Sequence, residues 1–277
     1  STSRGLGDVY KRQVILCWAL WGCSTYNSSE TEYVSEIATS DRSVLTERQK
    51  HILAEESLPT DLDELTASQK RGIMNIENAF LYLDEKYPGI EFDYVSHYPA
   101  GLMGQEKTDF IPKGYDKEDS RNLITVEKDR KGIFDDRNGY MLVAVRETME
   151  KVITEYVESY FGEGNVKVYI HPYLAEMEYG DEINENTVKD KVKSTAVLFA
   201  SDELCTETQL DAFSDNYKND GHDFECEFRA TIIRKSDFEG LTFNNCGDMY
   251  DSDHIIYDID ICLLYTSPSP RDVEESR

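Results

Sequence analysis

Two histidines stand at equivalent places in the chain and are the first candidates for chemistry. His97 and His171 each follow a stretch of alternating apolar and polar residues, and each has proline and tyrosine nearby. A histidine can act as a general base when a carboxylate orients its ring. If the two histidines converge, Glu91 or Asp93 could orient them in a hydrolase-type site. A histidine beside proline at a strand end also suits an ordinary turn, so both interpretations stay open.

The densest group of oxygen and nitrogen ligands lies late in the chain and consists of Asp251, Asp253, His254, Asp258 and Asp260. On a strand, Asp258 and Asp260 would share one face, where two carboxylates could meet a cation such as calcium. The spacing matches no metal-binding loop, and a solvated acidic surface explains the same residues. A calcium-dependent surface module is therefore a hypothesis beside the enzymatic one.

Common catalytic and nucleotide-binding motifs do not occur in the sequence. The G-x-S-x-G, P-loop, H-E-x-x-H and C-x-x-C patterns are all missing, so no cofactor is expected. The net charge of −26 over 277 residues repels phosphate backbones and argues against nucleic acid as a partner. Cys205, Cys226 and Cys246 permit one disulfide in any of three pairings, although Cys226 also suits an apolar core.

The elements that must position these residues begin with two helices. In residues 66–87 the apolar side chains recur at steps of three and four, which places five of them on one helical face: Ile73, Ile76, Phe80, Leu83 and Tyr87. Residues 45–56 predict a shorter helix, and both helices start with a Thr-x-x-Gln capping box. We expect the two helices to form a helical hairpin.

Strands are predicted on both sides of a second long helix. The earlier strands, separated by the turn-rich segments 112–122 and 129–139, form an antiparallel meander and span residues 90–95, 108–112, 123–128 and 140–145. Two further helices are predicted, the second long helix at 149–160 and a shorter one at 206–217. The later strands span residues 166–170, 195–200, 224–232 and 255–261. Along the third of these, Glu225, Glu227, Arg229, Thr231 and Ile233 form a mostly polar face that we expect to be largely wet.

This order of elements predicts an α+β fold. We expect a helical hairpin and two further helices packed on a mainly antiparallel sheet, as a two-layer sandwich. The globular domain is expected to span residues 44–261. Whether its parts 44–145 and 146–261 are two halves of one sheet or two domains stays open.

A short apolar stretch precedes the globular part. Residues 14–22, VILCWALWG, are too few to span a bilayer and are typical of the end of a secretion signal. The stretch runs into Leu20-Trp21-Gly22-Cys23, which resembles the lipobox of bacterial lipoproteins of the Gram-positive type, with Trp21 in place of the usual small residue. The resemblance implies that Cys23 carries diacylglycerol and becomes the mature N-terminus at the membrane. The polar residues 23–43 would then form a flexible tether.

Both ends of the chain are expected to be foreign to the protein. Residues 3–13 (SRGLGDVYKRQ) and 262–272 (CLLYTSPSPRD) resemble translations of the two opposite strands of one transposase sequencing adapter. Two unrelated natural termini would hardly share one piece of DNA. Residues 1–13 and 262–277 are therefore treated as an adapter artefact and left out of the fold prediction.

The leader, the tether, the acidity and the missing motifs together predict a membrane-tethered extracytoplasmic lipoprotein. We expect a non-catalytic module that binds an unknown protein or small-molecule ligand or interacts with the cell envelope. A hydrolase-type enzyme that uses His97 or His171 with carboxylates is one alternative, and the calcium-dependent surface module is the other.

Overall fold

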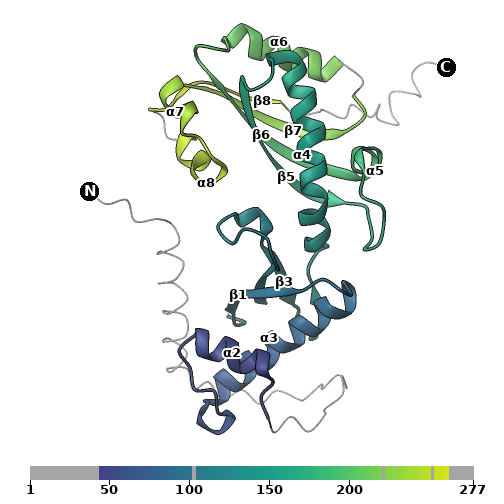
Figure 1. Ribbon diagram of the computed structural model, residues 1–277, viewed down its shortest axis with the longest axis vertical. Coiled ribbons are helices and arrows are strands. Elements are labelled where there is room, and N and C mark those ends of the chain that lie inside the picture. Colours follow the sequence, from purple (N-terminus) through teal and green to yellow (C-terminus); the bar gives the residue numbers. More distant parts are fainter. Residues whose placement is uncertain (1–43, 102–103, 220–221, 251–252, 262–277) are drawn as a thin grey trace, which may run out of the picture. The chain divides into compact units, whose positions relative to one another are not determined.

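The computed structural model describes residues 44–101, 104–219, 222–250 and 253–261 (Figure 1). These residues divide into two compact units, with the boundary between Tyr140 and Met141. No helix in the described ranges is both long and apolar enough to cross a membrane. Several predictions fall outside the described residues: the leader 14–22, the lipobox with Cys23, the tether 23–43, the adapter segments 1–13 and 262–277, and Asp251.

The first unit contains two helices and a four-stranded meander. Both α2 (Glu47–Glu55) and α3 (Ala67–Lys86) begin with the predicted capping box, and they confirm the helical hairpin. The strands pair antiparallel in the order β1-β2-β3-β4 and span Phe92–Tyr98, Glu106–Pro112, Ile124–Lys128 and Phe134–Asp135. Two 3-10 turns, η2 (Leu62–Glu64) and η3 (Ser120–Asn122), lie in the connections.

The predicted apolar face of α3 forms one side of the core of this unit. Ile73, Ile76 and Leu83 are completely buried. Phe80 meets Phe110 of β2 edge to face, with the ring centroids 4.7 Å apart. The periodicity in the sequence therefore identified the side of the helix that covers the sheet, because burial of apolar surface is the main force that holds the two layers together.

The second unit is built on a mixed sheet with the strand order β5-β6-β7-β8. The β6 and β7 strands are parallel because α6 (Glu207–Asn219) carries the chain from one to the other, and the outer pairs are antiparallel. The strands span Val166–Ala175, Val192–Ser201, Glu225–Ile233 and Ile255–Ile261. The other helices are α4 (Gly139–Phe161), α5 (Glu185–Lys191), α7 (Lys235–Glu239), α8 (Phe243–Cys246) and the 3-10 turn η4 (Gly247–Tyr250).

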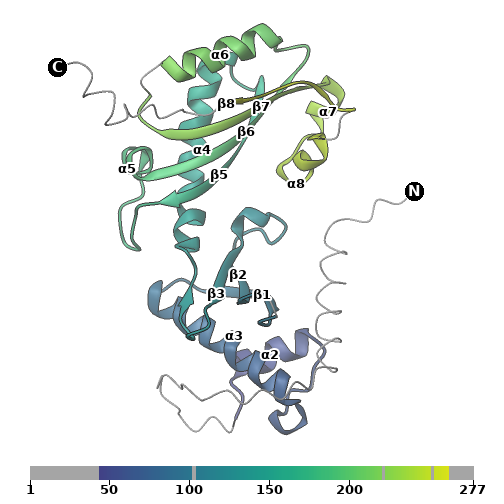
Figure 2. The ribbon, with the colours of Figure 1, turned by 180° about the vertical axis from the view of Figure 1, so that it is seen from behind.

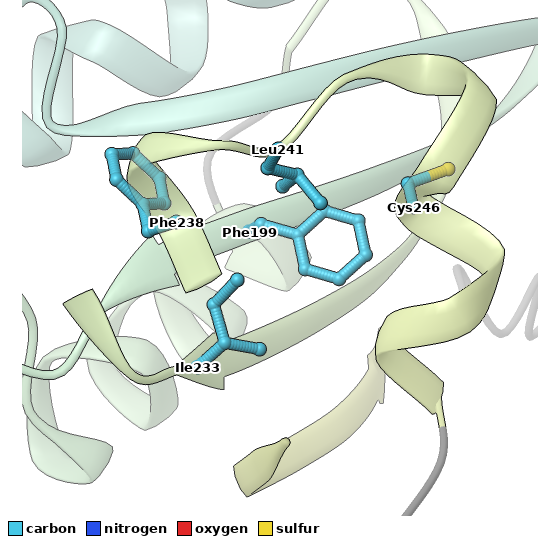
Figure 3. Packing of buried hydrophobic residues seen from close by; sticks show 5 residues of the cluster. All are labelled: Phe199, Ile233, Phe238, Leu241 and Cys246. Atoms are coloured by element: carbon cyan, nitrogen blue, oxygen red, sulfur yellow. The ribbon is translucent and has the colours of Figure 1, made fainter. Parts of the chain in front are cut away.

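Side chains are buried on both faces of the second sheet. On one face, Phe228 of β7 packs against Phe213 and Tyr217 of α6, with ring centroids 5.6 and 4.9 Å apart. Phe228 pairs with Ala196, three residues before Phe199 on β6, so Phe199 points to the other face. There a second cluster joins β6 and β7 to the α7–α8 region, which lies beside one end of the sheet in both ribbon views (Figures 1 and 2). Figure 3 shows its five buried side chains: Phe199, Ile233, Phe238, Leu241 and Cys246.

The α+β class and the mainly antiparallel pairing are confirmed, with the strands divided between two sheets. The strand predicted at 140–145 is wrong, because these residues belong to α4. A short apolar run cannot be assigned to helix or strand from periodicity alone. Only Arg146, Glu147 and Thr148 separate this run from the predicted helix, and none of them breaks a helix, so one helix continues through both.

The three cysteines of the described residues are buried, and none of them forms a disulfide. Burial raises the pKa of Cys205 to about 11 and that of Cys226 to about 12, because a thiolate is poorly solvated in an apolar core. Cys246 packs in the cluster with Phe199. The possible disulfide is therefore not formed, and the three thiols contribute to packing.

A buried carboxylate, Asp136, ties the last turn of α3 to the segment that follows β4. Its Oδ2 accepts a hydrogen bond from the Tyr87 hydroxyl at 2.7 Å. Its Oδ1 accepts from the Tyr82 hydroxyl at 3.0 Å and from the Lys86 ammonium. The backbone N–H of Asn138 also donates to Oδ1, at 3.3 Å. These donors replace the water that the carboxylate loses on burial.

Two opposing effects set the pKa of Asp136. Burial raises it, but the hydrogen bonds from Lys86, Tyr87 and Tyr82 and the positive charge of Lys86 outweigh burial and hold the pKa below 3.8. A carboxyl group whose pKa is lower in the folded state stabilises the fold fully above its unfolded pKa. That contribution is lost as the pH falls through the lower, folded-state value.

We expect Asp136→Asn to lower the free energy of unfolding of the first unit by about 2–3 kcal/mol at neutral pH. The amide cannot accept from all the donors, and Lys86 loses its counter-charge. Urea denaturation followed by circular dichroism measures the change, and the variant should lose less stability than the parent on acidification below about pH 4. The control is Asp135→Asn at the exposed neighbouring position, which should stay within about 0.5 kcal/mol. Equal stability of the two variants would contradict the role of Asp136.

Candidate functional site

His97 is buried inside the first unit. A β-bulge between Tyr94 and Ser96 shifts the register of β1, so that Ser96 and His97 are both buried and His97 pairs with Thr108 of β2. The histidine is 2 % exposed. Its Nδ1 lies 3.0 Å from the Thr108 hydroxyl oxygen, and its Nε2 lies 3.3 Å from a carboxylate oxygen of Glu106. Both ring nitrogens therefore contact side chains of the same sheet.

The Glu106 carboxylate connects His97 to α3. Asn75 of α3 donates to Glu106 at 2.7 Å, and Lys128 of β3 lies 3.7 Å from the carboxylate while donating to Asn75 at 2.9 Å. Burial raises the pKa of Glu106, but the hydrogen bond and charge of His97, with help from Asn75 and Lys128, lower it below 4.5. Ionised Glu106 thus has partners on three elements, which is how a buried charge is made tolerable in a core.

Neither unit brings His97 and His171 together, although the sequence had suggested that they could converge. His97 belongs to the first unit, whereas His171 lies at an exposed position of β5 in the second unit, paired with Thr195. The carboxylates expected to orient them are engaged elsewhere. Glu91 pairs with Lys113, and Asp93 lies 3.1 Å from Lys117. The carboxylate that contacts His97 is Glu106, which the sequence reasoning did not select.

The predicted cation cluster is engaged mainly by an arginine in its described part. Asp258 and Asp260 lie on the same exposed face of β8. Asp258 accepts from Arg229 Nη2 at 2.8 Å and Nε at 3.2 Å, and from the Thr231 hydroxyl at 2.7 Å. Asp253 is exposed. Within the described ranges, no group of three or more His, Cys, Asp or Glu side chains could hold a metal ion.

A hollow of about 1190 Å³ is lined by α3, by the hairpin that joins β3 to β4, and by the described residues of the connection from β1 to β2. We call it the hairpin hollow. Its helical wall includes Leu81 and Tyr82, and its hairpin wall includes Arg130, Lys131, Ile133 and Phe134. The rings of Tyr82 and Phe134, which both line the hollow, are stacked with centroids 6.3 Å apart. The hollow therefore offers cationic and apolar side chains in one place.

The hairpin turn is held in shape by Asp129. Its carboxylate accepts from the backbone N–H groups of Lys131 and Ile133, each at 2.8 Å. Gly132 has a φ of +85°, which a glycine adopts without steric cost. The turn thereby presents Arg130 and Lys131 from a defined backbone, and binding would require less ordering of the chain than a mobile loop would.

Sequence reasoning missed the hairpin hollow because it treated residues 129–139 as a turn-rich connection. The signal was present as two adjacent cations in a strongly acidic chain, followed by a glycine and an isoleucine. Their opposite wall could not be inferred, because Leu81 is separated from Ile133 by more than fifty positions and no local pattern links them.

Comparisons find no protein-family model, curated protein or solved structure that matches this chain. The geometry of its own residues is therefore the basis for assigning a function.

We expect His97→Asn to destabilise the first unit by about 2 kcal/mol, because it disrupts contacts with Thr108 and leaves Glu106 with fewer partners. Urea denaturation at neutral pH provides the measurement. The matched control is His51→Asn on α2, where the side chain is 74 % exposed and lies 3.4 Å from Glu55. This control should change stability by less than about 0.5 kcal/mol. Parent-like unfolding of the His97 variant would show that the network does not stabilise the fold.

We expect the thermal unfolding midpoint to be the same with added calcium and after chelation. Asp258 already accepts hydrogen bonds from Arg229 and Thr231, and a ligand that binds the folded state must raise the midpoint. Differential scanning calorimetry makes the comparison. A calcium-dependent rise that disappears in Asp258→Asn would establish the calcium-dependent module instead.

Proposed function

We propose that the chain is a membrane-tethered extracytoplasmic lipoprotein whose folded part binds a ligand without catalysing a reaction. The burial of His97 is the observation that argues against catalysis by this histidine. A general base must come within hydrogen-bond reach of its substrate. His97 is 2 % exposed, and its two nitrogens contact Thr108 and Glu106, so a substrate would have to open the core to reach it.

The hairpin hollow supports binding as the alternative to catalysis. Ligand sites in proteins are concave and combine apolar walls with a few convergent polar groups. The hollow has both kinds of side chain, from α3 on one side and the hairpin on the other. The hollow lies in the same unit as the buried contacts of His97 with Thr108 and Glu106, which we call the His97 network. In this proposal the network stabilises the fold, and the hollow binds the ligand.

The tether is proposed from the sequence of the leader. The lipobox-like Leu20-Trp21-Gly22-Cys23 follows an apolar stretch and precedes polar residues up to position 43. A diacylglycerol group on Cys23 would bury two acyl chains at about 0.8 kcal/mol per CH₂, which is enough for stable anchoring where one chain is marginal. The proposed place of the folded units is then the outer face of the cell membrane.

Mass spectrometry of the protein expressed in a bacterium from its natural start tests the tether. We expect a mature chain that begins at Cys23 and carries the mass of a diacylglycerol group, recovered in the membrane fraction. Cys23→Ser is the control and should lose both the added mass and the membrane association. An unmodified Cys23 inside an intact leader would rule out the lipid anchor.

A further inference from the structure

We propose that the hairpin hollow binds an anionic amphiphile, with the anionic group at Arg130 and Lys131 and the apolar part against Leu81 and Ile133. This inference rests on the proposed binding function and names its ligand class. The ligand would carry a phosphate or a similar anion joined to an apolar chain. Lipids with anionic headgroups have this chemistry, as do soluble phosphate esters with an apolar part.

The two cations are available for a ligand. The side chains of Arg130 and Lys131 form no hydrogen bond or ion pair with other described residues, whereas their neighbours Lys128 and Arg137 pair with Glu106 and Glu127. The chain has 55 acidic and 29 basic residues. Two adjacent cations without a carboxylate partner, on the wall of a hollow, therefore favour an external anion.

The carboxylates of the hollow leave its hairpin side positive. Three of them line it, namely Glu85, Glu106 and Asp129. Glu106 is engaged by His97, Asn75 and Lys128, and Asp129 accepts from two backbone N–H groups. Only Glu85 stays exposed on the helical side. An anion at Arg130 and Lys131 would thus approach two free cations and no free carboxylate of the hairpin.

The exposed apolar side chains of the hollow are the proposed contacts for the apolar part of the ligand. Ile133 is 60 % exposed and Leu81 is 40 % exposed, and both line the hollow. Single exposed apolar residues are common on protein surfaces. Here both line the same hollow as the stacked Tyr82 and Phe134 rings and the two cations, and a hydrocarbon segment would remove this apolar surface from water.

Calorimetric titration of the Cys23→Ser chain with three probes tests the ligand class. The probes are dihexanoylphosphatidylglycerol below its critical micelle concentration, dihexanoylphosphatidylcholine below its own, and inorganic phosphate. We expect the phosphatidylglycerol to bind at least about tenfold more tightly than either of the others, and to bind more weakly as salt is added. Equal affinity for phosphatidylcholine would refute the anionic contact, and equal affinity for phosphate would refute the apolar contact.

Paired variants test the location. Arg130→Gln/Lys131→Gln should weaken phosphatidylglycerol binding at least about tenfold, because two charge-assisted contacts are lost. The matched control is Lys218→Gln/Arg234→Gln, which removes two exposed cations of the second unit and should bind like the parent. Ile133→Ser should weaken the binding of phosphatidylglycerol without changing the affinity for phosphate.

Two results would overturn the proposal: no binding of phosphatidylglycerol by the parent, or parent-like binding by the Arg130/Lys131 variant. Either failure is distinguishable from failure of the lipid anchor, because the titrations use the Cys23→Ser variant, which cannot be lipidated, whereas the anchor is tested by mass spectrometry of the wild-type protein. If wild-type protein is lipidated but the hollow binds no phosphatidylglycerol, the lipid anchor is supported and the proposed ligand class is rejected.

Discussion

The first unit depends on the buried carboxylate of Asp136. Tyr82, Lys86 and Tyr87 donate to it from the last turns of α3, and the backbone of Asn138 donates from the segment after β4. Burying a charge costs free energy, and several donors are needed to offset that cost. The end of α3 and the segment after β4 must therefore keep their relative position, because a shift of either one would leave the carboxylate without some of its donors.

This constraint extends to the proposed binding site. Tyr82 donates to Asp136 and also lines the hairpin hollow, while Phe134, two residues before Asp136, stacks on the Tyr82 ring. The same hydrogen bonds that close the end of the unit therefore set the spacing of the two walls. The hollow is positioned by a helix, a short strand and a buried charge, which favours a preformed site.

The His97 network is a second buried polar group in the first unit. Its presence alone does not indicate an active site. Histidines near carboxylates are common in active sites, but they also satisfy buried polar groups. Here the Glu106 carboxylate bonds to α3 and contacts two strands, so its partners extend through the helix–sheet interface. The arrangement connects layers of the fold, and the accessible cations lie outside it on the hairpin.

The second unit shows how tertiary packing can change the meaning of a strand pattern. The alternation along β7 predicted a largely wet face, and Glu227 and Arg229 are exposed as expected. Thr231 and Ile233 on the same face are buried instead. Ile233 lies in the cluster with Phe238 and Leu241 near α7 and α8. These short helices have five and four residues, too few to produce a readable helical period.

The sequence by itself determined the local elements of this protein. Capping boxes at Thr46 and Thr66, the apolar stripe of α3 and the alternation of most strands predicted the α+β class, because each is set by neighbours a few residues apart. Only the tertiary structure decided which sheet each strand joins, that residues 140–145 continue α4, that His97 meets Glu106, and that Arg130 and Ile133 lie across a hollow from Leu81. Those outcomes depend on residues distant in sequence, whose pairing is decided by the packing free energy of the whole unit and leaves no local period.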